Sequence, residues 1–176
     1  MSTASNILKL SNLLYRLTSL SLVLLPLAVL GFALRDAMMP ETLAERFPTL
    51  SVTATPGTAL MAALAGLLPM IAMLYALAEM RGLFARYRKG EILTEACAAR
   101  IQGLGQGLFA LAALSPIAHM LQVLALTWHN PPGQKVLQIS LDGSLLGFLL
   151  SGALMVLIGR VMREASRIAA ENAEFV

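Results

Sequence analysis

Charged residues are scarce in this chain. They make up 13% of its 176 residues, whereas soluble domains carry about 25%. Hydrophobic residues make up 57% of the chain, and its mean hydropathy is +0.74. So little charge cannot cover a water-facing surface. The composition therefore excludes an ordinary soluble domain and predicts an integral membrane protein in contact with membrane lipid.

The chain also has few residues of the kinds that catalysis uses. Cys97 is its single cysteine, which excludes an internal disulfide and a cysteine-based metal cluster. No Ser-His-Asp set, metal-ligand spacing or phosphate-binding loop is present. We therefore predict no enzymatic activity, no catalytic or metal-binding residues and no cofactor. We expect Cys97 to be an inert small residue, although a thiol near a helix start can be reactive.

His119 is the one candidate for binding a cofactor inside the membrane. A neutral imidazole can ligate a metal or a chlorin-type pigment, and Gln122 lies one helical turn away. The simpler interpretation is a histidine bonded to a neighbouring helix.

Four long apolar segments organise the chain. They cover residues 13–34, 58–80, 101–128 and 139–160 approximately. About 20 apolar residues in a helix cross the hydrocarbon core, and a spanning segment must satisfy its own backbone hydrogen bonds. We predict an all-α, integral membrane fold, with residues 1–176 as one membrane domain of four transmembrane helices. The first segment is too long for a signal peptide and lacks a clear cleavage site, so we expect it to be retained.

Basic residues are distributed unequally between the two sides. Two precede the first apolar run, five follow the second and three follow the fourth, and these segments share one side; Arg35, Arg46 and Lys135 lie on the other. The ratio of ten basic residues to three predicts that the side with ten is cytoplasmic. We expect a bacterial inner membrane protein with both termini in the cytoplasm, an outer loop at 35–57, a cytoplasmic reversal at 81–100 and a cytoplasmic C-terminal helix at 161–176. The excess of positive charge flanks the membrane spans, so we expect no direct contact with nucleic acid.

The reversal contains signals for a helix end and a helix start. Glycine is favoured just after a helix C-terminus, and Gly90 occupies such a position. Thr94 can cap the next helix, with Glu95 in its first turn. We therefore expect the second, third and fourth helices to extend into the cytoplasm.

The C-terminal helix carries an apolar repeat. Val161, Ala165, Ile168, Asn172 and Phe175 recur at spacings of four and three residues, as in a coiled coil. We expect this repeat to pack on the chain's own second helix near Phe84 and Tyr87, and pairing with a partner is the alternative. Charged residues at helical spacing accompany it: Arg160–Glu164, Glu164–Arg167 and Arg167–Glu171.

Small residues recur at four-residue spacing within the spans. Gly103 and Gly107 form one such set, and Gly143, Gly147 and Ser151 form another. This spacing favours close helix packing, either within one chain or between copies, so a homo-oligomer is possible. Pro26, Pro69 and Pro116 lie within spans and predict kinks. In the first outer loop, Pro40–Phe47 suggests a short helix, and a plain connector is the alternative.

The reversal and the C-terminus together resemble a known family. The stretches are "LFARYRKGEILTEACAARIQGLGQGL" and "VMREASRIAAENAEFV". They are similar to the DUF2975 family of small bacterial four-helix membrane proteins, in which a Phe-x-x-Tyr-x-x-Gly-Glu-x-Phe-Thr pattern joins the second and third helices. The matching residues are Phe84, Tyr87, Gly90, Glu91 and Thr94, then Glu171, Asn172 and Val176 at the end. Leu93 replaces the usual aromatic residue. The resemblance implies a partnership with small helix-turn-helix regulators encoded beside such proteins.

Our leading hypothesis is that the basic cytoplasmic face binds a protein partner, which the resemblance suggests is a regulator held at the membrane. The candidate partner-binding residues are Phe84, Tyr87, Arg88, Lys89, Gly90, Glu91, Thr94, Arg163, Arg167, Glu171 and Asn172. One alternative is an accessory subunit of a larger membrane complex, packed through the small-residue faces. A second is a small transporter or channel that depends on His119 or Gln122.

Overall fold

The chain folds into long helices that can cross a membrane. The computed structural model describes residues 2–39, 55–131, 135–140 and 143–174. Its helices are α1 (Ser2–Met38), α3 (Pro56–Gly66), α4 (Leu68–Tyr87), α5 (Glu95–Thr127) and α6 (Gly143–Glu174), and these described residues form no strand. Four stretches are long and apolar enough to span a bilayer: Leu8–Met38, Pro56–Tyr87, Glu95–Thr127 and Gly143–Glu171. The prediction of an all-α, four-span, multi-pass membrane protein is confirmed.

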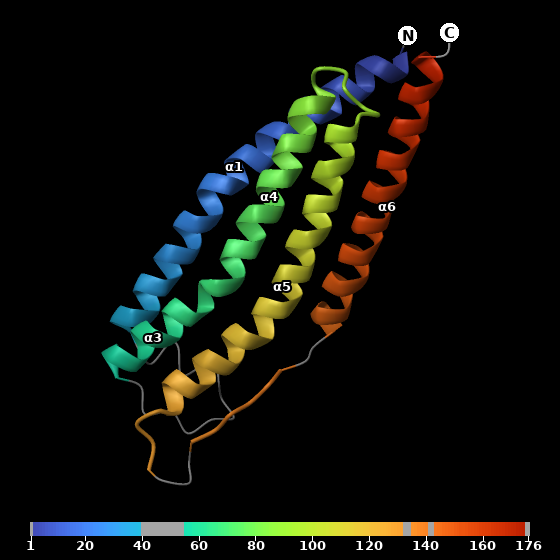
Figure 1. Ribbon diagram of the computed structural model, residues 1–176. Coiled ribbons are helices and arrows are strands. Elements are labelled where there is room, and N and C mark those ends of the chain that lie inside the picture. Colours follow the sequence, from blue (N-terminus) through green and yellow to red (C-terminus); the bar gives the residue numbers. More distant parts are fainter. Residues whose placement is uncertain (1, 40–54, 132–134, 141–142, 175–176) are drawn as a thin grey trace.

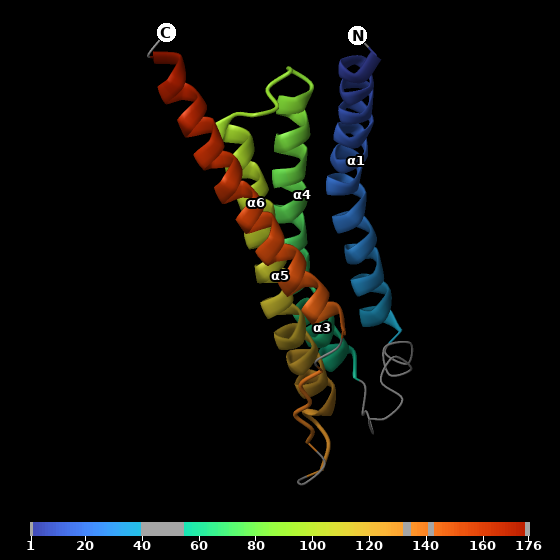
Figure 2. The ribbon, with the colours of Figure 1, turned by 90° about the vertical axis from the view of Figure 1, so that its right-hand side faces the viewer.

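The helices form an open row rather than a closed bundle. α4 lies between α1 and α5, and α5 lies between α4 and α6 (Figures 1 and 2). Among the described helices α6 contacts only α5, and α1 contacts only α3 and α4. Both edge helices leave large apolar side chains exposed, such as Leu27 at 61% and Leu150 at 71%. A bilayer can solvate these side chains as readily as a protein core does, which makes the open row possible.

Pro69 divides the second span into α3 and α4. Proline has no N–H for the carbonyl four residues earlier, and its ring clashes with that carbonyl. The chain instead makes three-residue turns here: Leu67 N donates to Leu64 O at 3.1 Å, and Met70 N donates to Leu67 O at 3.1 Å. Pro26 and Pro116 do not interrupt α1 and α5.

Glycines set the distance between α5 and α6. A Cβ atom added at Gly105 would lie 2.7 Å from the carbonyl oxygen of Gly152, and one at Gly159 would lie 2.9 Å from the carbonyl oxygen of Ala98. Real Cβ atoms do not approach other atoms so closely, so larger side chains would push the helices apart. This glycine seam, formed by Gly105, Gly152 and Gly159, joins α5 and α6, the two helices with the most extensive contact.

The two small-residue sets singled out in the sequence have different surroundings. Gly103 and Gly107 face α4, where an added Cβ would meet the Glu79 carboxyl group at 2.9 Å and Ala76 Cβ at 2.9 Å. Gly143 and Gly147, by contrast, have no atom within 4 Å of an added Cβ. Together with exposed Ser151, they form an outward stripe that takes no part in packing within the described chain.

Several sequence predictions lie outside the described residues. These are the short helix at Pro40–Phe47 and the last two residues of the chain, including Phe175. The side chain of Asn172 is likewise not described.

The glycine seam predicts different costs for two similar substitutions. Gly105→Leu should destabilise the fold, because overpacking typically costs about 1–3 kcal/mol and, apart from α5, none of the described helices contacts α6. Gly143 is the first residue of α6 and faces open space, so Gly143→Leu should leave the stability within about 0.5 kcal/mol of the parent. Thermal unfolding in detergent, followed by circular dichroism, measures both variants. Equal stabilities would contradict the seam.

Candidate functional site

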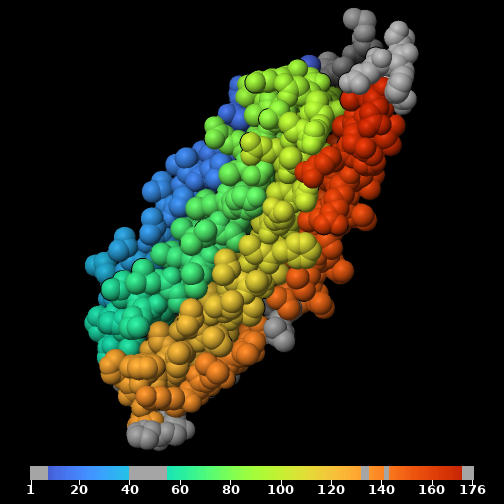
Figure 3. Space-filling view, in the orientation of Figure 1, coloured from blue at the N-terminus to red at the C-terminus, as the bar shows by residue number. Residues whose placement is uncertain are grey.

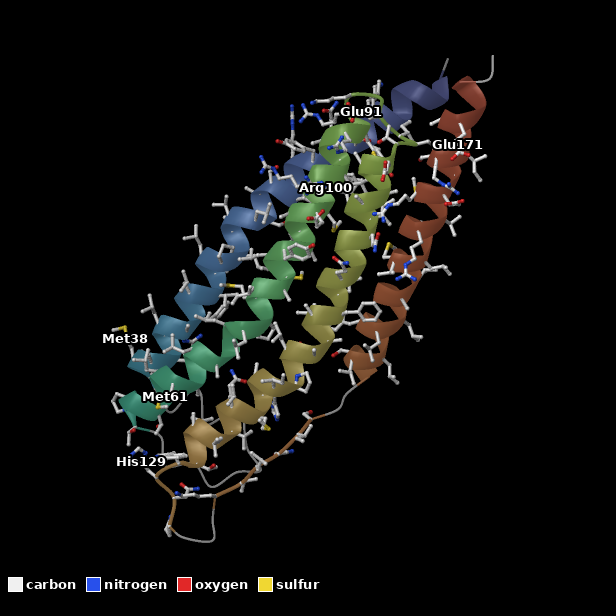
Figure 4. All side chains as sticks on the ribbon, in the orientation of Figure 1. Met38, Met61, Glu91, Arg100, His129 and Glu171 are labelled. Carbon is white, nitrogen blue, oxygen red and sulfur yellow. The ribbon has the colours of Figure 1, made fainter. Side chains whose placement is uncertain are left out.

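One end of the molecule gathers the features that the sequence singled out. The start of α1, the reversal between α4 and α5, and the C-terminal part of α6 all lie at this end (Figure 1). We call it the basic end, because the segments that meet there hold ten of the thirteen Lys and Arg residues. Glu91 and Glu171 mark it in Figure 4, and His129 marks the opposite end.

The reversal is a tightly bonded turn. Gly90 has φ of +81°, a conformation that other residues adopt only with strain. Arg86 Nη1 lies 3.0 Å from Glu91 Oε2, and Cys97 Sγ donates to the carbonyl oxygen of Glu91 at 3.0 Å. The Thr94 hydroxyl accepts from Cys97 N at 3.3 Å and caps α5. The predicted helix stop at Gly90 and helix start at Thr94 are both found.

Cys97 belongs to the interior of this end. Its side chain is 0% exposed and packs with Leu83 and Ile101, and Tyr87 and Met162 cover the cluster. An inert small residue, as predicted, fits these surroundings.

Tyr15 ties α1 to the row. The guanidinium carbons of Arg81 and Arg88 lie 5.3 and 4.5 Å from the centre of its ring, within the range of cation–π attraction. Arg81 also donates to Tyr15 Oη at 3.1 Å and to Ser19 Oγ at 3.0 Å. Sequence analysis missed these contacts, because the partners lie 62 or more positions apart and spacing identifies only near neighbours.

Several candidate partner-binding residues therefore have roles within the chain. Tyr87 covers the Cys97 cluster, Arg88 stacks on Tyr15, and Gly90, Glu91 and Thr94 build the turn. The remaining candidates on the described surface divide by exposure: Phe84 and Arg163 are partly buried, whereas Lys89, Arg167 and Glu171 are exposed. The turn also exposes two apolar residues that we did not predict, Ile92 at 40% and Leu93 at 76%.

The apolar repeat on α6 faces away from the other helices. Val161 is 61% exposed, Ile168 is 48% exposed and Ala165 is also exposed. We call these three residues the apolar seam. The expectation that it packs on the second helix near Phe84 and Tyr87 is wrong, because no Cα atom of α6 lies within 8 Å of one in α4.

The glycine seam explains this outcome. It brings Gly152 and Gly159 against α5, and at 3.6 residues per turn Val161, Ala165 and Ile168 lie on the opposite face of α6. The apolar seam is therefore directed outward. Arg167 supports the outer surface of the helix by pairing with Glu164 and, at 3.3 Å, with Glu171, as the spacing predicted.

The polar residues within the membrane do not form a common site. His119 lines a cavity of about 90 Å³ between α5 and the start of α6, with Ser115, Ser140 and Ser144. Gln122 lines a separate cavity of about 120 Å³ beside α1 and α3. A space of about 90 Å³ is too small for a chlorin macrocycle. In the described part of the chain no three His, Cys, Asp or Glu side chains are grouped to hold a metal ion.

Comparison with known proteins gives a family and no characterised relative. The family model described as "Protein of unknown function (DUF2975)" matches residues 30–176. No curated protein and no solved structure matches the chain. The match covers the last quarter of α1 and all of the other three described spans, including the reversal and α6. The chain therefore belongs to the DUF2975 family.

Proposed function

We propose that this protein is a non-enzymatic docking protein of the bacterial inner membrane, and that its basic end binds a protein partner in the cytoplasm. The observation that carries the proposal is the apolar seam of Val161, Ala165 and Ile168, which is exposed immediately beyond the apolar run of α6. In the proposed topology this stripe lies beyond the bilayer, and no described part of the chain covers it. Such stripes bind a second helix or a groove.

The surroundings of the apolar seam indicate the chemistry of the partner. The exposed side chain of Leu93 lies at the same end, and the Arg163–Glu95 contact, with Nε and Oε1 4.0 Å apart, joins α6 to the start of α5 there. Arg160 and Lys89 are exposed and basic. A partner helix with an apolar face and acidic flanks matches this surface. A small helix-turn-helix regulator held at the membrane is the partner that the family resemblance suggests.

Substitution of one seam residue tests the proposal. Ile168→Ser removes an apolar side chain, and burial of an isoleucine is worth about 1.5–3 kcal/mol, so partner affinity should fall about tenfold or more. Ala170→Ser is the matched control, because Ala170 is exposed on the same helix outside the apolar seam. The measurement is quantitative mass spectrometry after gentle solubilisation, with the neighbouring genes co-expressed.

The expected outcome is one protein recovered with the parent chain and with Ala170→Ser, and depleted with Ile168→Ser. A chain that repeatedly purifies alone contradicts the proposal. So does a partner that is retained equally by all three chains.

The outward glycine stripe supports a second candidate function, that of an accessory subunit in a larger membrane complex. Gly143, Gly147 and Ser151 are exposed, and space above the two glycines is open. Small residues at this spacing let another helix approach closely. The stripe lies within the apolar part of α6, so its partner would be a membrane helix.

Filling this stripe tests the second candidate. Gly143→Leu combined with Gly147→Leu should abolish comigration with a larger complex in native electrophoresis, while helix content in detergent is unchanged. Gly31→Leu is the control, because Gly31 in α1 also has no atom within 4 Å of an added Cβ. Unchanged assembly of the double variant would exclude the stripe as an interface.

The proposed orientation requires reporters other than the native cysteine. Cys97 is 0% exposed, and its thiol donates a hydrogen bond to the carbonyl oxygen of Glu91. An impermeant maleimide should therefore label it poorly from either side. In a Cys97→Ala background, Lys89→Cys should label in inverted vesicles only, and Lys135→Cys should label in intact spheroplasts only. Both lysines are exposed, one at each end of the row. The reverse labelling pattern would place the basic end outside.

A further inference from the structure

A polar groove lies on the side of the row at the level where α5 enters its apolar run. It has a volume of about 470 Å³, within the range of roughly 300–1,000 Å³ that is typical of ligand sites. Three small residues of α5, Ala96, Ala99 and Gly103, form its floor. α4 and α6 form its walls, and because these two helices do not contact each other the groove opens sideways. The bands of α4, α5 and α6 run side by side over the surface in Figure 3.

Three arginines line the groove, and each of them also contacts a carboxylate: Arg86 contacts Glu91, Arg100 contacts Glu79 and Arg163 contacts Glu95. Among the lining residues, Glu79 is the single acidic one. Arg100 Nη1 pairs with Glu79 Oε2 at 3.1 Å, and the Arg100 side chain remains 41% exposed. Figure 4 labels Arg100 where α5 lies beside α4. A guanidinium group has five N–H donors, so this single ion pair leaves most donors of Arg100 available.

Two buried polar atoms at the groove have no hydrogen-bond partner among the described residues. They are Arg163 Nε, a donor, and Gln102 Oε1, an acceptor. A buried polar atom without a partner is costly, and such atoms in native proteins usually have one. Both residues line the groove, so a ligand there that accepts from arginine and donates to an amide oxygen would satisfy both atoms once the two side chains turn toward it.

The face of α5 that floors the groove becomes apolar as it descends into the membrane. Gln106 is the last polar residue, and Ala110, Ala113 and Ile117 follow at helical spacing. Ala113 and Ile117 are exposed and Ala110 is partly buried. A polar hollow at the membrane interface therefore continues directly into an open apolar lane.

We propose that this groove binds the phosphate headgroup of an anionic membrane lipid, with an acyl chain along the Ala110–Ile117 lane. Arginine guanidinium groups match phosphate oxygens in geometry and charge. Gln102 Oε1 accepts a hydrogen bond from a headgroup hydroxyl, such as that of a glycerol headgroup. The apolar lane favours a lipid over free phosphate, because an acyl chain can contact the lane and inorganic phosphate cannot. This site is distinct from the apolar seam and does not depend on a protein partner.

Native mass spectrometry of the full chain in detergent tests the proposal with three probes: phosphatidylglycerol, phosphatidylcholine and inorganic phosphate. Arg163→Gln removes the guanidinium group whose Nε has no hydrogen-bond partner. Arg160→Gln removes the same charge three residues earlier on α6, outside the groove lining. Ala99→Leu fills the floor of the groove and changes no charge. Circular dichroism establishes that each variant retains its helices.

We expect the parent and Arg160→Gln to bind phosphatidylglycerol at least about tenfold more tightly than phosphatidylcholine. Arg163→Gln should lose about tenfold in affinity, the loss that corresponds to one charge-assisted hydrogen bond, and Ala99→Leu should lose binding as well. Equal binding of the two lipids would overturn the proposal. So would equal effects of the two arginine substitutions, unchanged binding by Ala99→Leu, or inorganic phosphate bound as tightly as the lipid.

Discussion

The close contact between α5 and α6 at Gly105, Gly152 and Gly159 is the constraint on which the rest of the arrangement depends. α6 has no other helix beside it among those described. With backbone atoms this close, α6 has one rotational position against α5. That position decides which of its faces is buried, and it leaves both the apolar seam and the stripe at Gly143 and Gly147 directed outward.

The same contact creates the groove. Gly103 and Gly107 bring α4 against another face of α5. α4 and α6 therefore pack on different faces of α5 and do not meet. Between α4 and α6 a strip of α5 stays uncovered, and small residues there leave a hollow lined by arginines. An open row in water would expose far too much apolar surface to be stable. In a bilayer the lipid covers that surface, and the row can expose specific strips of helix to other molecules.

Local chemistry in the reversal could be predicted because it involves neighbours in sequence. Gly90 ends a helix and Thr94 starts one through conformational freedom and capping, which act over three or four residues. The pairing of Arg167 with Glu164 and Glu171 follows from helical spacing in the same way. By contrast, the stacking of Arg88 on Tyr15 and the ion pair of Arg100 with Glu79 join residues distant in sequence. Several residues of the family pattern proved to maintain the turn and its packing. The exposed surface of the reversal includes Leu93, at the aromatic position of the pattern, and Ile92, which the pattern did not identify.

The sequence by itself determined the class of protein, the four membrane spans and the position of the turn between α4 and α5. These follow from apolar run lengths, the need for internal backbone hydrogen bonds, and local helix signals. Only the tertiary structure decided which face of each helix is covered. Many faces of a membrane helix are apolar, so hydropathy does not distinguish a face that contacts lipid from one that contacts protein. The distinction between Gly105, buried against Gly152, and Gly143, facing open space, depends on the approach of whole helices.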